Sequence, residues 1–266
     1  MPELPDVEAY LRVFDGCAGG RQVRRVEVRD SGVLRGMTAA GLRRELTGRR
    51  FGRPERRGKW LLAPTGGPTL LLHFGMTGEL VCAEGGRERH PHDRVVFVLG
   101  GGRELRFRDQ RKLKGLWLAH GLEDERRVIG DQGPDAGALS RAGLDAALAG
   151  HRGRLKPTLT DQSVLAGLGN LLADEILWRA RLHPRTPVPA LSDAQRGRLH
   201  RDMRATLRAS VASGRVPPGR DWLTGHRDAP AGDCPRCGTR LARGRVGGRG
   251  TVWCPHCQRE QETPRG

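Results

Sequence analysis

The sequence contains no apolar run that approaches the roughly twenty residues needed to cross a bilayer. Its first ten residues, MPELPDVEAY, also lack the basic and then apolar pattern of a secretory signal. These absences exclude a protein with helical membrane spans and give no sign of export. We therefore expect a cytoplasmic protein without a membrane partner.

Acidic residues and lysine are both scarce. Asp and Glu total 30 against 47 Lys and Arg, which gives a formal net charge of +17. Lysine occurs only as Lys59, Lys112, Lys114 and Lys156. The positive excess favours a polyanionic partner, and DNA or RNA is the first expectation. A basic surface without any partner is the alternative, since charge alone identifies no ligand.

Cysteine is limited to six positions in two groups. Cys17 and Cys82 are isolated, and we expect them to be ordinary buried thiols. The other four form two C-x-x-C pairs, a spacing that predicts one structural Zn²⁺ bound by four thiolates, with a redox dithiol as the alternative. Arginines and no acidic residue lie between these pairs, so this segment is expected to face DNA. The four predicted zinc ligands are Cys234, Cys237, Cys254 and Cys257.

Hydrophobic periodicity changes once along the chain. Residues 5–15 have a helical pattern that Gly16 can end, and residues 22–118 read as short strands separated by glycine-rich turns. This predicts an antiparallel sandwich or barrel. A segment rich in Gly, Pro and Asp predicts a domain junction near residues 129–138.

The second half of the chain has a helical period. We expect three or four helices within residues 140–149, 158–181 and 192–213. Ser192 and Gln195 have the spacing of a capping box at the start of the last one. Residues 214–233 then read as a linker rich in Gly and Pro.

The motif SVLAGLGNLLADEIL at residues 163–177 interrupts this helical pattern. Gly167 and Gly169 predict a turn whose backbone N–H groups bind a phosphate at a helix N-terminus, and Asn170 can add a side-chain donor. Close helix–turn–helix packing also needs glycine, so a purely structural role is the alternative.

The N-terminus carries a possible nucleophile. The small residue after Met1 favours removal of the methionine, which would leave Pro2 as a free secondary amine with a lower pKa than lysine. Attack of such an amine on a sugar C1′ gives a cationic iminium that accepts electrons in later steps. Glu3 stands beside it as a proton donor or acceptor. Without further context, the same residues would be an ordinary start of a chain.

Six motifs follow one another over nearly the whole chain: MPELPDVE, RRGKW, HFGMTGEL, DQRKLKG, AGLGN and RGTVWCPHC. Together and in this order they resemble the motifs of the formamidopyrimidine-DNA glycosylase and endonuclease VIII family. The resemblance implies an α+β multidomain fold and a monomeric base-excision enzyme, both a DNA glycosylase and an AP lyase, on damaged double-stranded DNA. Its implied parts are a helix with an antiparallel β-sandwich at 1–130, a helix-two-turn-helix domain at 131–225 and a zinc finger at 226–266.

The resemblance also assigns chemical roles to residues. It implies that Pro2 forms the Schiff base, that Glu3 acts as general acid and base, and that Lys59 assists β-elimination. Arg249 resembles the finger arginine that binds phosphate and assists δ-elimination. His73, His90, Lys156 and Asn170 match positions that contact the DNA backbone or the active site, and Glu175 one that supports the catalytic centre.

A glycosylase turns its target nucleotide out of the helix, and side chains must fill the gap. The resemblance implies that Met76, Arg111 and Leu113 do so. Leu113 replaces a residue that is commonly aromatic in the family, and Leu172 stands where tyrosine is frequent. A non-catalytic binder of damaged DNA on the same scaffold is the alternative function, and a zinc-ribbon regulator is a third.

Overall fold

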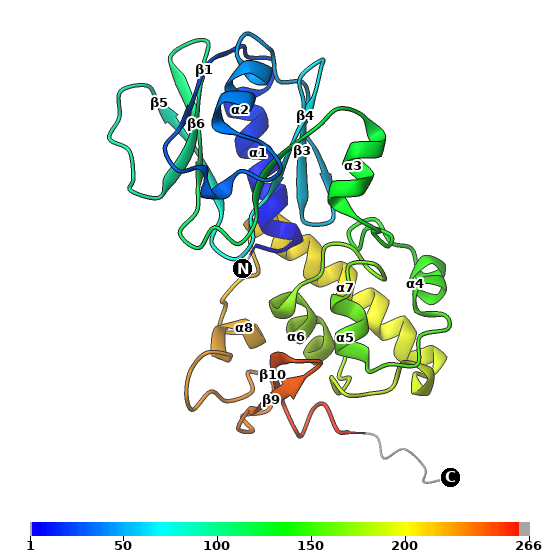
Figure 1. The fold of residues 1–266 in the computed structure, drawn as a ribbon. Coiled ribbons are helices and arrows are strands. Elements are labelled where there is room, and N and C mark those ends of the chain that lie inside the picture. Colours follow the sequence, from blue (N-terminus) through cyan, green and yellow to red (C-terminus); the bar gives the residue numbers. More distant parts are fainter. Residues whose placement is uncertain (1, 261–266) are drawn as a thin grey trace. The chain divides into compact units, whose positions relative to one another are not determined.

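The computed structural model describes residues 2–260 and divides them into two compact units (Figure 1). Unit 1 comprises Pro2 and Asp6–Asp131, and unit 2 comprises Glu3–Pro5 and the chain from Gln132 onward. Among the helices of residues 2–260, none combines the length and apolar character needed to cross a membrane.

Unit 1 contains two antiparallel four-stranded sheets with helices packed against them (Figure 1). The strand orders are β1-β6-β7-β5 and β2-β3-β4-β8. The elements are α1 (Leu4–Ala18, whose first two residues belong to unit 2), β1 (Val23–Val28), a 3-10 turn (Ser31–Val33), α2 (Ala39–Leu46), β2 (Glu55–Arg57), β3 (Trp60–Pro64), β4 (Thr69–His73), β5 (Glu79–Glu84), β6 (Asp93–Leu99), β7 (Arg103–Arg108), β8 (Gly115–Ala119) and α3 (Leu122–Ile129).

One apolar core joins both sheets of unit 1. Leu61 and Leu72 enter it from β3 and β4, Phe97 enters it from β6, and Phe14 of α1 stacks edge-on against Phe51 within it. The opposite face of β3 and β4 is buried as well, because α3 covers it. This explains why these strands are continuous apolar runs without polar alternation. The predicted sandwich is therefore confirmed.

Two local predictions in unit 1 are wrong. Gly16 does not end α1, which continues to Ala18 because its last residues are buried in the core, and that burial outweighs the cost of about 1 kcal/mol for a helical glycine. Helix α2 lies in a segment predicted as strands and turns, whereas no element was predicted over the residues of α3. The signal for α2 was the pair Leu42 and Leu46, both buried and one helical turn apart.

The prediction that Cys17 and Cys82 are ordinary buried thiols is also wrong. The two residues form a disulfide that joins α1 to β5, with a Cα–Cα distance of 5.8 Å. Cys17 is buried, whereas Cys82 is exposed at the edge of its sheet.

Unit 2 contains a helical bundle and a two-stranded hairpin. Its apolar core is formed by side chains of α4 to α7. The elements are α4 (Arg141–Leu148), α5 (Leu155–Thr160), α6 (Asn170–Arg179), a 3-10 turn (Val188–Ala190), α7 (Asp193–Ser213), α8 (Leu223–His226), β9 (Ala242–Val246) and β10 (Arg249–Trp253).

The start of α7 follows the prediction. Ser192 Oγ accepts from the N–H of Gln195 at 3.3 Å, and Gln195 Oε1 accepts from the N–H of Ser192 at 2.8 Å, which completes the capping box. Gly214 ends the helix in the left-handed conformation at φ 73°. The turn at 161–169 separates α5 from α6, in agreement with the predicted interruption of the helical pattern by Gly167 and Gly169.

Gly115 provides a test of the packing in unit 1. Its φ is +148°, and a Cβ atom there would lie 1.9 Å from the carbonyl oxygen of Val33. Gly121 has a similar φ of +135°, but a Cβ atom there would meet nothing within 4 Å. We expect Gly115→Ala to lower the free energy of unfolding by about 1–3 kcal/mol more than Gly121→Ala, because only the first adds a steric clash to the backbone strain. Urea denaturation of both variants measures the difference, and equal losses would contradict this account of Gly115.

Candidate active site

The carboxylate of Glu3 is held at the N-terminus of α6. Its Oε1 accepts from the N–H of Leu171 at 2.8 Å, and its Oε2 accepts from the N–H groups of Gly169 at 3.0 Å and Leu172 at 3.1 Å. The side chain is fully buried. Three N–H donors and the positive end of the helix dipole stabilise the ionised carboxylate. Glu3 therefore serves as the N-terminal cap that α6 lacks in its own sequence.

The glycines of the AGLGN motif make room for this residue. A Cβ at position 169 would lie 2.3 Å from the Glu3 carboxyl carbon, and one at Gly167 would lie 2.7 Å from Leu4 Cδ1. The N–H of Leu4 also donates to the carbonyl of Gly167 at 3.1 Å. The prediction that this turn presents its N–H groups to a phosphate is therefore wrong for Gly169 and the two leucines, since Glu3 is the anion that they bind.

A buried ionic cluster is centred on Asp174 of α6. Lys156 Nζ is 2.6 Å from Asp174 Oδ1, and both side chains are fully buried. Arg227 reaches Asp174 Oδ2 at 3.1 Å, and the backbone N–H of Val252 donates to the same oxygen at 3.3 Å. Burial raises the pKa of Asp174 and lowers that of Lys156, while their mutual attraction opposes both shifts. Removing one partner would leave an uncompensated buried charge.

This cluster fixes the strand that carries Arg249. The carbonyl of Gly250 accepts from Lys156 Nζ at 3.1 Å, from Asn170 Nδ2 at 3.0 Å and from an Arg227 Nη at 3.1 Å. Lys156 also donates to the Thr251 hydroxyl at 2.8 Å. Arg249 itself is exposed at the start of β10. The structure thus brings Lys156, Asn170 and Arg249 together, although the first two bind protein groups.

Glu175 is fully buried and holds the segment that follows α7. Its Oε1 accepts from Arg179 Nε at 2.8 Å, and its Oε2 accepts from the N–H of Thr224 at 3.1 Å. Burial raises the pKa of this carboxyl, against the lowering effects of Arg179 and Thr224. The predicted linker at 214–233 is therefore folded in part: it contains α8, with Leu223 buried. Glu175 supports this segment and presents no surface to a ligand.

Met76, Arg111 and Leu113 lie on two neighbouring loops of unit 1. An Nη of Arg111 is 3.1 Å from Met76 Sδ, and the backbone N–H of Arg111 donates to the Thr77 hydroxyl at 3.0 Å. Leu113 packs close to Gly75 on the first loop. Met76 and Leu113 are 41% and 49% exposed, a high value for apolar side chains. The three predicted gap-filling residues therefore form one projecting group.

His73, His90 and Lys59 belong to the same unit. The Nδ1 of His73 accepts from the N–H of Gly75 at 3.0 Å, which leaves its proton on Nε2. Burial lowers the pKa of His73 to about 4, and the charges of Lys114 and Lys59 contribute to this shift, so the ring is neutral at pH 7. His90 is exposed, and its ring centroid lies 5.1 Å from that of His92 at an interplanar angle of 55°. Lys59 follows Gly58 in the tight turn between β2 and β3.

The four paired cysteines converge. All four Sγ atoms lie within 4.8 Å of one another, with 3.6 Å between Cys237 and Cys254 and 3.5 Å between Cys237 and Cys257. Four thiolates around one Zn²⁺ at about 2.3 Å have S···S distances of about 3.8 Å, so this arrangement fits the metal. Trp178 Nε1 donates to the fourth sulfur, Cys234 Sγ, at 3.3 Å.

Sequence reasoning missed Asp174, Arg227 and Thr251. A signal existed for Asp174, because it and Glu175 are adjacent acids within the apolar stretch LLADEILW, and acids on a buried helix need partners. Arg227 lies in a segment without periodicity, and nothing in the local pattern distinguishes it from other arginines.

Three family models match consecutive parts of the chain. The formamidopyrimidine-DNA glycosylase N-terminal domain matches residues 1–116, and the formamidopyrimidine-DNA glycosylase H2TH domain matches residues 132–217. The zinc finger found in FPG and IleRS matches residues 234–259.

Curated relatives and solved structures agree with these matches. The formamidopyrimidine-DNA glycosylase of Moorella thermoacetica is 39% identical and covers 91% of this chain and 94% of its own, and that of Geotalea uraniireducens is 36% identical over 97% of this chain and 100% of its own. A Lactococcus lactis formamidopyrimidine-DNA glycosylase bound non-covalently to DNA with an AP site has a TM-score of 0.84 at 26% identity, over 97% of this chain and 100% of that one. The Lactococcus lactis enzyme in complex with DNA containing Fapy-dG has the same TM-score of 0.84, at the same identity and coverage. The chain belongs to the formamidopyrimidine-DNA glycosylase family.

Proposed function

We propose that this protein is a base-excision DNA glycosylase and AP lyase whose nucleophile is the amine of Pro2 after removal of Met1. The amine attacks C1′ of a damaged deoxynucleoside, the bond from C1′ to the base breaks, and the base leaves with a proton. The C1′–O4′ bond then breaks, O4′ takes a proton, and C1′ becomes the carbon of a cationic iminium. The observation that carries this proposal is the fixed carboxylate of Glu3 in the residue next to Pro2. The Lactococcus lactis complexes with damaged DNA support it by family membership.

Glu3 acts at the reacting sugar. Its three N–H donors favour the ionised carboxylate, which accepts a proton and stabilises the cationic iminium. The fully buried position keeps the carboxylate in one orientation. The protonated Glu3 carboxyl group then returns the proton to the sugar or to the departing base.

The iminium drives strand cleavage. Loss of a C2′ proton pushes electrons into the iminium and expels the 3′ phosphate, and a second elimination releases the 5′ phosphate. Lys59 assists the first elimination, and Arg249 binds phosphate and assists the second. The exposed Arg249, held through its neighbour Gly250, suits a phosphate contact.

The remaining site residues position the DNA. Met76, Arg111 and Leu113 occupy the gap left by the flipped nucleotide. His73 and His90 contact the backbone of the DNA. Lys156, Asn170 and Glu175 act through the segments that they hold, because the carbonyl of Gly250 and the Thr224 backbone are their partners.

The wider assignments are part of the same proposal. The protein acts in the cytoplasm as a monomer on double-stranded DNA. Its domains span residues 1–130, 131–225 and 226–266, and one structural Zn²⁺ is bound by the four cysteines. This metal would hold the finger hairpin together and supply no chemistry to the reaction.

Borohydride trapping tests the nucleophile. The protein incubated with an abasic duplex and borohydride should give a covalent complex, and peptide mass spectrometry should locate the bond at Pro2. Retention of Met1, or Pro2→Gly, should abolish trapping while non-covalent binding of DNA persists. Equal trapping by the form that retains Met1 would refute the assignment of Pro2 as the nucleophile. Binding without any trapping by the unaltered protein would favour the non-catalytic alternative.

Gly169→Ala tests the role of Glu3 without changing a chemical group. The added methyl would meet the Glu3 carboxyl carbon at 2.3 Å, so the carboxylate must move. We expect single-turnover base excision to fall at least about tenfold, or about 1.4 kcal/mol in the barrier, with DNA affinity largely kept. Gly16→Ala is the matched control, because nothing lies within 4 Å of its added methyl. Unchanged excision in a folded Gly169→Ala protein would remove Glu3 from the mechanism.

Metal analysis tests the zinc site. We expect about one zinc per chain, lost in Cys254→Ser together with most of the DNA affinity. Cys82→Ser is the control, since it removes a cysteine outside the cluster and should keep the metal. Full DNA binding by a zinc-free protein would contradict the proposed structural role.

A further inference from the structure

The disulfide between Cys17 and Cys82 joins two sulfurs in unlike surroundings. Cys17 lies in the last turn of α1 within the core of unit 1, with 1% of its surface exposed. Its sulfur is 3.6 Å from the carbonyl oxygen of Glu104. Cys82 is exposed on β5, the edge strand of its sheet. A reagent in solution therefore reaches only the Cys82 side of the bond.

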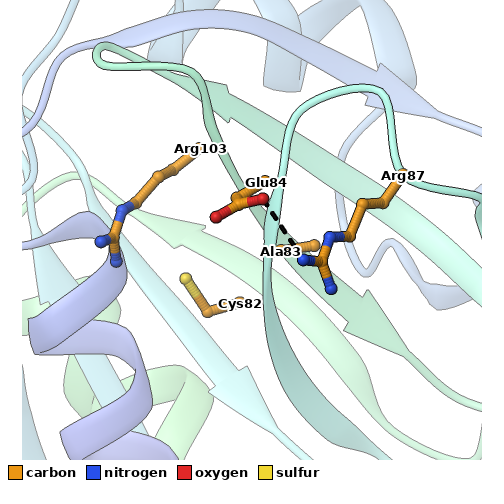
Figure 2. Close-up of a pocket in the computed structure, with 5 residues that line it drawn as sticks. All are labelled: Cys82, Ala83, Glu84, Arg87 and Arg103. Atoms are coloured by element: carbon orange, nitrogen blue, oxygen red, sulfur yellow. Dashed lines mark hydrogen bonds and ion pairs between the residues drawn. The ribbon is translucent and has the colours of Figure 1, made fainter.

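Cys82 opens into a pocket of about 220 Å³ (Figure 2). Arg87 and Arg103 line this pocket, together with Ala83 and Glu84. Arg87 forms an ion pair with Glu84 at 3.3 Å. Within residues 2–260, no ion pair involves Arg103, whose guanidinium stands free beside the pocket. The pocket therefore carries a net positive charge.

These surroundings assign different chemistry to the two thiols when the disulfide is reduced. An accessible sulfur beside guanidinium groups is stabilised as a thiolate, which is the nucleophilic form. A sulfur in an apolar core at the negative end of a helix dipole stays a neutral thiol. Redox-sensing cysteines combine such an exposed thiolate with a nearby resolving thiol.

We propose that Cys82 is a hydroperoxide-reactive thiol and that Cys17 is its resolving thiol. The Cys82 thiolate attacks one oxygen of a hydroperoxide, so that an S–O bond forms, the O–O bond breaks and hydroxide or an alkoxide leaves. The Cys17 thiol then attacks the sulfenic sulfur. The S–S bond forms, the S–O bond breaks, and the thiol proton leaves with the hydroxyl group as water. Two thiols are oxidised and one hydroperoxide is reduced.

The oxidised state ties α1 to the edge of the sandwich. The bond closes a segment with a sequence separation of 65 residues, and a loop of this length restricts the unfolded chain strongly. Helix α1 begins two residues after Pro2, so oxidation stabilises the element that follows the proposed nucleophile. This inference stands apart from the proposed glycosylase activity, because it concerns only side chains of unit 1.

The test uses the full-length, zinc-loaded protein after mild reduction. One equivalent of hydrogen peroxide should restore the bond between Cys17 and Cys82, identified by alkylation and peptide mass spectrometry. In Cys17→Ser, dimedone should label Cys82 as a sulfenic acid, whereas in Cys82→Ser the label on Cys17 should be at least tenfold lower. Cys17→Ala repeats the dimedone labelling of Cys82 without placing a hydroxyl group in the core.

Two further measurements separate the proposal from a merely structural disulfide. Arg103→Ala should slow labelling of Cys82 severalfold in the Cys17→Ser background, and the exposed Arg208→Ala on α7 should not. The midpoint of thermal unfolding should rise by several degrees on oxidation of the unaltered protein and stay constant in Cys17→Ala. Failure of peroxide to restore the bond, equal labelling of both cysteines, or a disulfide that is reduced only on unfolding would each overturn the proposal.

Discussion

The contact between the Glu3 carboxylate and the first turn of α6 is the interaction on which the candidate site depends. A helix N-terminus leaves N–H groups without partners, and a carboxylate buried away from water needs donors. Each therefore satisfies the other, although the two are separated by more than 160 positions in the sequence. Gly167 and Gly169 are required because any larger residue would occupy the space of Leu4 or Glu3. The carboxylate that we propose to act in catalysis is thus also a structural cap, and its orientation follows from the backbone of the helix.

Asp174, further along α6, also binds groups that are distant in the sequence, but through full charges. Asp174 pairs with both Lys156 and Arg227, and all three are connected to β10. A cluster of this kind contributes little net stability, since desolvation offsets the attraction. Its value lies in specificity: the charged groups have few other arrangements that satisfy them. The segment 249–252 is therefore held in one position by bonds that are costly to break singly.

Features encoded by neighbouring residues could be predicted from the sequence. Ser192 and Gln195 marked the start of α7, and the two cysteine pairs marked the converging thiols, because in each case the spacing itself determines the geometry. Features that depend on distant partners could not. The AGLGN turn was recognised as unusual, but its ligand was taken for a phosphate, since nothing local indicates that Glu3 fills it. The pairing of Cys17 with Cys82 likewise depends on the packing of α1 against β5.

The linker between α7 and the cysteine pairs illustrates the same limit. Its Gly and Pro content predicts an irregular chain, yet Trp222 packs under the guanidinium of Arg179 at 4.1 Å and Thr224 binds Glu175. Such contacts cannot be predicted from composition, because each uses a residue of α6, which is distant in the sequence. Composition correctly predicted that most of the segment lacks regular secondary structure. It did not predict that the segment is held in place by contacts with α6.

The carbonyl of Gly250 receives three side-chain donors, and a carbonyl is present whatever residue occupies the position. The space beside its α-carbon is empty, and its φ lies outside the left-handed region. Position 250 is therefore anchored by its backbone while its side chain is unconstrained. A cysteine introduced there could carry a fluorophore or a spin label next to Arg249, at a point whose location is set by the ionic cluster beneath it. A firmly held stretch of the hairpin backbone is in this way also a place that tolerates a probe.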